Sequence, residues 1–427
     1  MSVRSFIAAA ERDVDALHSL VFRRGGDVVA EGAWHPYTLD RPHRLFSLSK
    51  SFTSTAAGFA VAEGLLSVDD PVAAHCDGRG DPRLLVRHLL AMTTGHVIEP
   101  QLSGRDWLTS FLDTPVEKEP GTHWLYNTPA TYALGAIVQR LTGQRLVDYL
   151  RPRLFDPLGF GPVTWEQCPE GRDVAGWGMF ARTHEIARFG QLYLHDPDGI
   201  LPPGWAAEAT RTQADNDDGG GDLPDWNQGY GFQFWRCRHN AFRGDGAFGQ
   251  FCVVIPDRDA VLAMTAGTTD MQRVLDLAWE HLLDDLAPDP DATANLVLPA
   301  VPGGPSTVEG RFVVAVPRQA HPDDWRPSHE RVPTIRAVTL APGRVVFEDA
   351  AGTQEHPYAP GAWVPNGATA ATGAWEGNVL TLRVAYVDGP FIRTYRCEAD
   401  GDELVIHPGD NVSFGPTGYP AVRATRA

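Results

Sequence analysis

Lysine is scarce in this chain. Of the 36 basic side chains among its 427 residues, only Lys50 and Lys118 are lysines, and the others are arginines. The 54 acidic side chains give a formal net charge of −18, and no basic block interrupts them. Such an acidic surface repels phosphate groups and anionic lipid heads, so we expect no nucleic-acid partner and no membrane partner.

Long apolar runs and paired cysteines are also missing. No run approaches the roughly 18 apolar residues of a membrane span, and residues 1–25 carry charges where a secretory signal has an apolar core. The five cysteines are widely spread without C-x-x-C spacing, which is typical of reduced thiols. The sequence therefore predicts a cytoplasmic protein.

Metal-binding and nucleotide-binding patterns are absent as well. The acidic stretch 215–222 is followed by Trp226 where an EF-hand loop needs its last carboxylate. The histidines show no metal-ligand spacing, and no phosphate-binding or dinucleotide-binding glycine motif occurs. We expect no metal and no cofactor.

Prolines and glycines concentrate in residues 287–305, where both helical and strand periodicity break. We expect a linker at 289–305 that joins a domain of residues 1–288 to a C-terminal β-sheet domain of residues 306–427. Apolar and polar residues alternate over 380–386, as in a half-buried strand. We find no cluster of reactive side chains in this C-terminal part.

Helix and strand patterns mix before the linker. Capping residues and prolines predict helices that begin at Asp81 and Thr128, and a similar pattern begins at Thr183. Apolar runs on both sides of residues 257–259 predict a buried hairpin. Strands at the beginning and end of this region, with helices between them, indicate an α+β fold with an antiparallel sheet.

Residues 45–64 hold the clearest candidates for chemistry. Apolar residues recur there at helical spacing, and Gly64 ends the pattern. Ser47 and Lys50 are about one helical turn apart, so the hydroxyl and the amine share a face near the helix N-terminus. A lysine buried among apolar groups has a lowered pKa and can take the proton of a serine hydroxyl. The N–H of Ser47 is suited to hold an oxyanion.

The structural alternative is an exposed lysine beside a capping serine. Two features favour the catalytic interpretation of Lys50. Little charge follows it until Glu63, and arginine, which the chain uses almost everywhere else, cannot be deprotonated to act as a base. Lys118, between Glu117 and Glu119, is expected to be a solvated surface charge.

Several segments, in order, resemble one known family. The string HRLFSLSKSFTSTAAGFAVAEGLLSVDDPV, residues 43–72, resembles the S-x-x-K region of the serine beta-lactamase and penicillin-binding-protein superfamily. The likeness is to its class C-like hydrolases, which include esterases and D-amino-acid peptidases. Residues 123–143 resemble the tyrosine motif with its helix, residues 183–194 another helix, and residues 244–266 the third motif with the closing hairpin.

This resemblance implies a beta-lactamase-like antiparallel sheet with flanking helices and a helical subdomain, here followed by a small C-terminal all-β domain. It places the nucleophile and its lysine on Ser47 and Lys50, and the catalytic tyrosine on Tyr126. The tyrosine would move a proton between Ser47 and the leaving group, with Lys50 holding the phenolate or sharing its proton. The second motif usually reads Tyr-Ser-Asn, whereas here Asn127 follows the tyrosine directly, so the substrate-contacting amide is shifted or replaced.

The third motif departs further from the family pattern. It usually carries a lysine or histidine, and the corresponding segment here, FRGDGAFGQ, contains neither. Gly246 permits close approach of a substrate backbone, and the N–H of Ala247 or Phe248 is a candidate oxyanion donor. Arg243 or Asp245 is a candidate for setting the charge preference.

The sequence therefore predicts a cofactor-independent serine hydrolase that cleaves an ester or amide through a Ser47 acyl-enzyme. The expected substrate is a small-molecule ester, an amide or a short peptide. A basic group in the third motif normally meets a substrate carboxylate, so esterase or amidase activity is expected rather than true beta-lactamase activity. The alternative is a non-catalytic or weakly catalytic sensor or binding protein of the penicillin-binding type.

Overall fold

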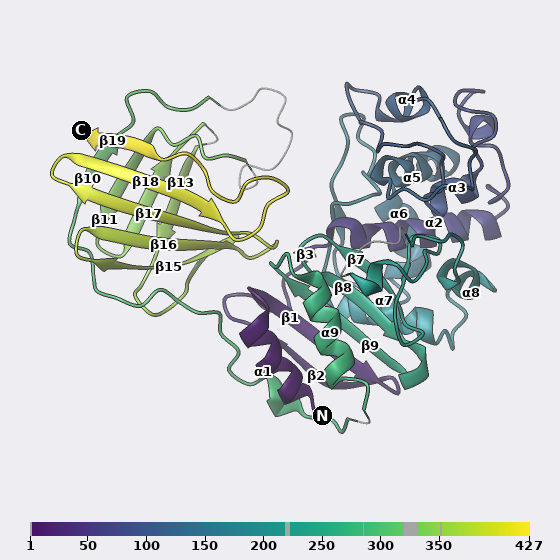
Figure 1. Ribbon diagram of the computed structural model, residues 1–427, viewed down its shortest axis with the longest axis horizontal. Coiled ribbons are helices and arrows are strands. Elements are labelled where there is room, and N and C mark those ends of the chain that lie inside the picture. Colours follow the sequence, from purple (N-terminus) through teal and green to yellow (C-terminus); the bar gives the residue numbers. More distant parts are fainter. Residues whose placement is uncertain (1, 218–222, 285, 320–330, 351) are drawn as a thin grey trace.

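The molecule has two parts that lie next to each other along its long axis (Figure 1). One part holds a six-stranded sheet surrounded by helices, and the other is built mainly of strands. The computed structural model describes residues 2–217, 223–284, 286–319, 331–350 and 352–427. Residues 218–222 of the acidic stretch therefore lie outside the described residues.

The six-stranded sheet is antiparallel, with strand order β2-β1-β9-β8-β7-β6. Its strands are β1 (Leu17–Arg24), β2 (Asp27–Ala33), β6 (Trp235–Arg236), β7 (Phe242–Gly246), β8 (Gln250–Ile255) and β9 (Ala260–Ala266). Every residue of β8 and β9 is buried, which confirms the predicted hairpin around residues 257–259. A run of apolar residues without alternation fits this position, because both faces of these strands are covered.

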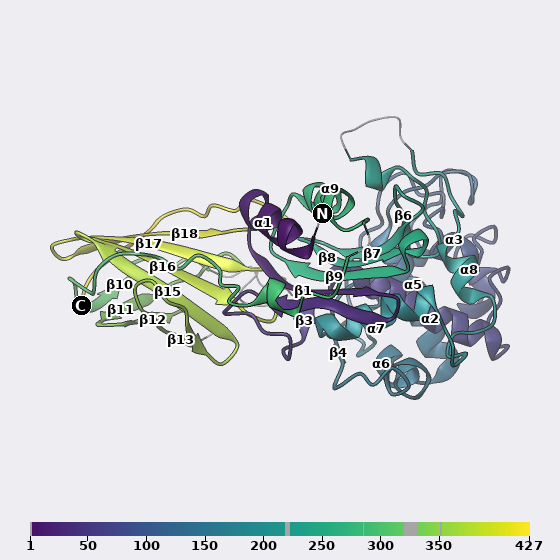
Figure 2. The same ribbon diagram turned by 90° about the horizontal axis from the view of Figure 1, so that it is seen from below.

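Helices cover both faces of this sheet. Helices α1 (Val3–Asp13) and α9 (Met271–His281) pack together on one face, and α7 (Thr183–Leu194) packs on the other (Figure 2). Helix α7 begins at the predicted threonine. A second, three-stranded sheet has the order β3-β5-β4. It consists of β3 (His43–Arg44), β4 (Thr164–Trp165) and β5 (Met179–Ala181).

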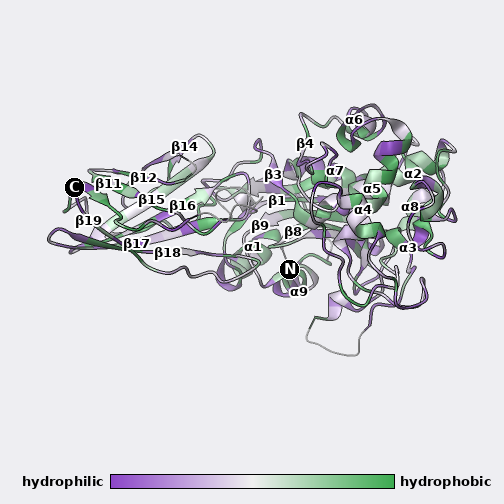
Figure 3. Cartoon of the chain, turned by 90° about the horizontal axis from the view of Figure 1, so that it is seen from above, coloured by the Kyte–Doolittle hydropathy of each residue, from purple (hydrophilic) through white to green (hydrophobic). Residues whose placement is uncertain are grey.

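Beyond the edge of the main sheet lies a helical region. It contains α2 (Ser49–Ala62), α3 (Val86–Leu90), α4 (Trp107–Leu112), α5 (Thr128–Thr142), α6 (Leu146–Leu150) and α8 (Trp205–Thr210). Its central helices α2 and α5 contact each other and are largely hydrophobic (Figure 3). The predicted start and stop of α5 are confirmed: Pro129 lies in its first turn, and Gly143 ends it with φ +66°.

The helix expected from Asp81 is shorter than predicted. Helix α3 begins only at Val86, because the preceding backbone is bonded elsewhere. The N–H of Val72 donates to the carbonyl of Leu84, and the N–H of Val86 donates to the carbonyl of Asp70. These tertiary hydrogen bonds hold the first residues of the predicted helix in extended pairing.

The C-terminal part is a ten-stranded sheet with order β13-β12-β11-β10-β19-β18-β17-β16-β15-β14. The strands are β10 (Gly310–Val313), β11 (Ala337–Ala341), β12 (Arg344–Glu348), β13 (Thr353–Pro357), β14 (Val364–Asn366), β15 (Thr369–Glu376), β16 (Val379–Tyr386), β17 (Ile392–Asp400), β18 (Glu403–Asp410) and β19 (Val422–Arg426). Its two end strands approach each other, since β13 contacts both β14 and β15, so the sheet is barrel-like. The predicted fold class, α+β with a C-terminal all-β part, is confirmed. Within the described ranges, no helix is long and apolar enough to cross a membrane.

The core of the helical region offers a direct stability test. Phe52 of α2 is fully buried and stacks on Phe189 of α7, with ring centroids 3.9 Å apart. Phe52→Ala should lower the free energy of unfolding by about 3–5 kcal/mol, measured by urea denaturation, because it removes a buried ring and leaves a cavity. The same substitution at Phe414, which is 72% exposed, should change it by about 0.5 kcal/mol or less. Equal effects at the two positions would contradict this packing.

Candidate active site

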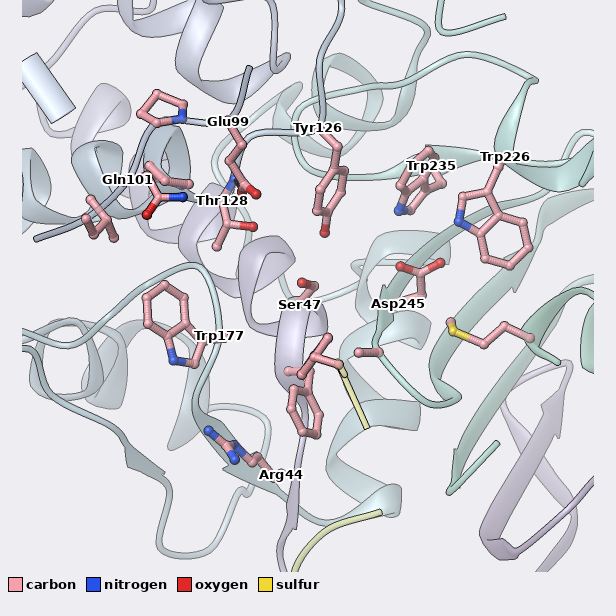
Figure 4. Close-up of a pocket in the computed structure, with 17 residues that line it drawn as sticks. Arg44, Ser47, Glu99, Gln101, Tyr126, Thr128, Trp177, Trp226, Trp235 and Asp245 are labelled. Atoms are coloured by element: carbon pink, nitrogen blue, oxygen red, sulfur yellow. Dashed lines mark hydrogen bonds between the residues drawn. The ribbon is translucent and has the colours of Figure 1, made fainter. Parts of the chain in front are cut away.

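Ser47 lies where the helical region meets the edge of the main sheet. A short 3-10 helix, η1 (Phe46–Leu48), carries this serine and leads directly into α2, and β7 packs alongside η1. Ser47 lines a cleft of about 740 Å³, which is within the size range of small-molecule sites (Figure 4).

Lys50 is buried directly behind this serine. Its side chain is enclosed, and its Nζ donates one hydrogen bond to Ser47 Oγ (2.8 Å) and another to the carbonyl of Gly176 (2.7 Å). Burial lowers the pKa of Lys50 to about 7, against a weaker opposing effect of the Glu99 and Asp245 carboxylates. Near neutral pH much of Lys50 is therefore an uncharged amine that can accept a proton.

Tyr126 completes the group around the serine (Figure 4). Its hydroxyl points toward Ser47, and its ring stacks on Trp235 with centroids 5.5 Å apart. Lys50 Nζ lies 5.0 Å from the centre of the tyrosine ring. Burial, reinforced by the Asp245 carboxylate, raises the pKa of Tyr126 well above its usual value, so the hydroxyl keeps its proton near neutral pH.

Asn127 does not line the cleft. Its side chain is fully buried, and its Oδ1 accepts a hydrogen bond from the N–H of Ala130 (2.9 Å), which caps α5. Its Nδ2 donates to Thr94 Oγ1 (3.1 Å). The structure thus places this amide where it holds the start of α5. The next residue, Thr128, lines the cleft instead.

Two glycines let β7 approach the segment that carries Ser47. A Cβ at Gly246 would overlap the carbonyl oxygen of Leu45, and a Cβ at Gly244 would overlap side chains at the start of α2. The close approach that Gly246 permits is therefore between β7 and the backbone just before Ser47. It brings Ala247, which lines the cleft, to the same wall as Ser47.

Arg243 and Asp245 form a buried ion pair behind this wall. Arg243 is fully enclosed, and its Nε donates to Asp245 Oδ2 over 2.8 Å. Its guanidinium also lies over two indoles, 4.2 Å from the ring centre of Trp226 and 5.3 Å from that of Trp235. Of the two charge candidates only Asp245 lines the cleft, so the third motif presents a carboxylate where the family usually has a cation.

Two backbone N–H groups at this wall are available to a ligand. In the part of the chain that the structure describes, neither the N–H of Ser47 nor the N–H of Ala247 donates a hydrogen bond. Each has a neighbour with a left-handed backbone: Phe46, before the serine, has φ +48°, and Phe248, after the alanine, has φ +68°. Such angles are uncommon for residues with bulky side chains and are maintained only by surrounding contacts.

Most residues of the cleft walls are not predicted from the sequence. The additional lining residues that shape the cleft are mainly aromatic or charged: Arg44, Phe46, Glu99, Trp177, Trp226, Trp235, Met271 and Phe414. The aromatic run GYGFQFW, which ends at Trp235, was an available signal for one wall. No spacing could have linked Phe414, in the C-terminal part, to a serine near the N-terminus.

Other reactive groups lie away from this site. All five cysteines are free and buried, and burial raises the pKa of Cys252 to about 12, so this thiol is protonated. Among the described residues, no group of three or more His, Cys, Asp or Glu side chains is arranged to hold a metal ion.

Solved structures that share this fold, an antiparallel sheet flanked by helices with a helical region beside it, include a beta-lactamase from Mycobacterium bovis and a penicillin-binding protein homologue from Pyrococcus abyssi. The family model for beta-lactamase matches residues 11–286, well over half of the chain. The chain therefore belongs to the beta-lactamase family.

Named relatives match only part of the chain. Lovastatin esterase of Penicillium rubens is 28% identical over 195 residues, which cover 36% of this chain and 48% of that protein. D-aminopeptidase of Brucella anthropi is 31% identical over 157 residues, 32% of this chain and 30% of that protein. The matches thus span less than half of these relatives' own length.

One solved structure covers both parts of the molecule. The octameric penicillin-binding protein homologue from Pyrococcus abyssi aligns over 99% of each chain, with a TM-score of 0.53 and 16% identity. At this identity the likeness concerns the fold alone, and it extends through the C-terminal sheet.

The scarcity of lysine makes the protonation of Lys50 directly measurable. Selective ¹⁵N labelling of lysine side chains should give two signals, and the Lys118→Arg variant should retain only that of Lys50. That signal should titrate near pH 7, because burial favours the neutral amine. A titration near pH 10, as for an exposed lysine, would show that water reaches the amine.

Proposed function

We propose that this protein is a serine hydrolase that cleaves an ester or amide through an acyl-enzyme on Ser47. The observation that carries the proposal is the contact between Lys50 Nζ and Ser47 Oγ, 2.8 Å apart, with the amine buried and the serine open to the cleft. A neutral amine at hydrogen-bond distance is the base that a serine hydroxyl needs to become a nucleophile.

In the first step Ser47 Oγ attacks the carbonyl carbon of the substrate and gives its proton to the neutral amine of Lys50. The carbonyl oxygen becomes an oxyanion, and the N–H groups of Ser47 and Ala247 donate hydrogen bonds to it. These donors lie at the same cleft wall and have no competing acceptor among the described residues, which supports this role.

In the second step the bond to the leaving oxygen or nitrogen breaks, and that atom takes a proton from the Tyr126 hydroxyl. The raised pKa of Tyr126 supports a proton donor rather than a resting phenolate. The Lys50 ammonium then returns a proton to the tyrosine. Water repeats the sequence on the acyl-enzyme, which releases the acid and restores Ser47.

The walls of the cleft favour an uncharged substrate with apolar groups. Trp177, Trp226 and Trp235 line it, and the third motif contributes the Asp245 carboxylate instead of a cation. The Asp245 carboxylate is paired with the buried Arg243, so this motif offers a substrate carboxylate no free cation. We therefore favour esters and amides over beta-lactams, and relatives named as an esterase and a D-aminopeptidase support the same reaction class.

The nucleophile and its base are tested by substitution. Ser47→Ala should lower the hydrolysis of p-nitrophenyl acetate by roughly 10³-fold or more. Lys50→Arg should be almost inactive, because a guanidinium keeps its proton. Lys118→Arg is the matched control and should keep full activity, since Lys118 is exposed. Full activity of Ser47→Ala would refute the assignment.

Mass spectrometry after treatment with a fluorophosphonate separates the two candidate functions. The hydrolase should gain one adduct that Ser47→Ala does not. A native chain with neither adduct nor turnover would instead favour the sensor or binding protein, for which the altered third motif is the supporting observation.

The pH dependence follows from the protonation of Lys50. The value of kcat/KM should rise with pH and level off above about pH 7, because only the neutral amine accepts the serine proton. Activity should fall about tenfold for each pH unit well below that value. Tyr126→Phe should lower the plateau without moving the midpoint, and a midpoint that moved with this substitution would assign the titration to the tyrosine.

A further inference from the structure

The C-terminal sheet is joined to the segment that carries the catalytic serine. The N–H of Arg44 donates to the carbonyl of Asp388 (2.8 Å), and the hydroxyl of Tyr37 donates to the carbonyl of Gly389 (3.3 Å). Residues 388–389 lie in the turn between β16 and β17. Hydrogen bonds therefore connect this turn to the chain just before Ser47.

A second attachment holds the loop that follows β18. Asn411 Nδ2 donates to the carbonyl of Gly267, directly after β9, over 2.9 Å, and to the carbonyl of Pro390 over 3.0 Å. Its Oδ1 accepts from the N–H of Ile392 (2.7 Å). The side chain of Asn411 thus fixes the beginning of the loop against the first part of the molecule.

This loop places Phe414 over the two left-handed residues of the site. The Phe414 ring lies 5.8 Å from that of Phe46 and 4.8 Å from that of Phe248, centre to centre. Both of these phenylalanines also contact Phe391 and belong to the hydrophobic core of the C-terminal sheet. Packing from the C-terminal part therefore holds the backbone on either side of the two proposed oxyanion donors.

Phe414 is nevertheless 72% exposed while it lines the cleft. An apolar ring that projects into an open cleft is available to cover an apolar group of a substrate. In Figure 4 the yellow ribbon of the C-terminal part passes below Ser47, whereas Tyr126 lies above it. A leaving group must face Tyr126 to take its proton, so the acyl group extends toward the opposite side.

We propose that the C-terminal sheet forms one wall of the acyl site and that Phe414 selects substrates with a large apolar acyl group. This inference rests on the proposed hydrolase function and names its substrate class. The bulky acyl chain lies against Phe414, whereas an acetyl group is too short to reach it.

The kinetic test compares p-nitrophenyl phenylacetate with p-nitrophenyl acetate. Phe414→Ala should lower the ratio of kcat/KM for the phenylacetate to kcat/KM for the acetate about tenfold, as for the loss of part of an apolar pocket. Val316→Ala is the control, because Val316 is an apolar side chain of the same sheet region, 88% exposed and outside the cleft. It should leave the ratio unchanged. Equal thermal midpoints of all three proteins would confirm that folding is unaffected.

A binding test does not depend on turnover. In the Ser47→Ala background, phenylacetamide should quench the fluorescence of the cleft tryptophans, and adding Phe414→Ala should raise its Kd about tenfold. If the native chain cleaves neither ester, the hydrolase proposal fails, and this Kd still decides the role of Phe414. An unchanged Kd together with an unchanged ester ratio would overturn the proposed acyl wall.

Discussion

The site depends on the burial of the Lys50 amino group, which keeps water away from it. Among the residues that the structure describes, the amine has two hydrogen-bond partners, Ser47 and the carbonyl of Gly176, and neither carries a charge. A charged ammonium is therefore poorly compensated there, which favours the neutral base. Arginine could not replace it, because a guanidinium stays charged, and this explains why a chain so rich in arginine has lysine at this position.

The parts of the fold that the sequence predicted have local causes. Helix α5 has a capping residue, an early Pro129 and a terminal Gly143, and the β8–β9 hairpin has two apolar runs around a short turn. Helix α3 was mispredicted because hydrogen bonds to residues 70–72 outweigh its good start signal. The strand order of the C-terminal sheet could not be predicted from local patterns. Its first strand, β10, pairs with its last, β19, and most of that part of the chain lies between them.

The candidate site was predictable to the same limited extent. Ser47 and Lys50 could be found by spacing and by the scarcity of lysine, whereas Tyr126 came only from the family resemblance. Asn127 has the right chemistry for a substrate contact, but its side chain caps α5 and does not line the cleft. The aromatic walls come from segments far apart in the chain, so only the folded structure gathers them. The cytoplasmic location and the linker at 289–305 stay predictions.

The packing of Phe46 and Phe248 inside the C-terminal core also bears on how such proteins can evolve. Two modules joined by a linker are normally free to be exchanged by recombination, because each keeps its own core. Here, exchanging the C-terminal sheet would remove the residues that pack against two aromatic rings next to the nucleophile. The left-handed backbone of Phe46 and Phe248 would then be left without support. The two parts are therefore expected to be inherited together, and substitutions in one should be accompanied by matching changes in the other.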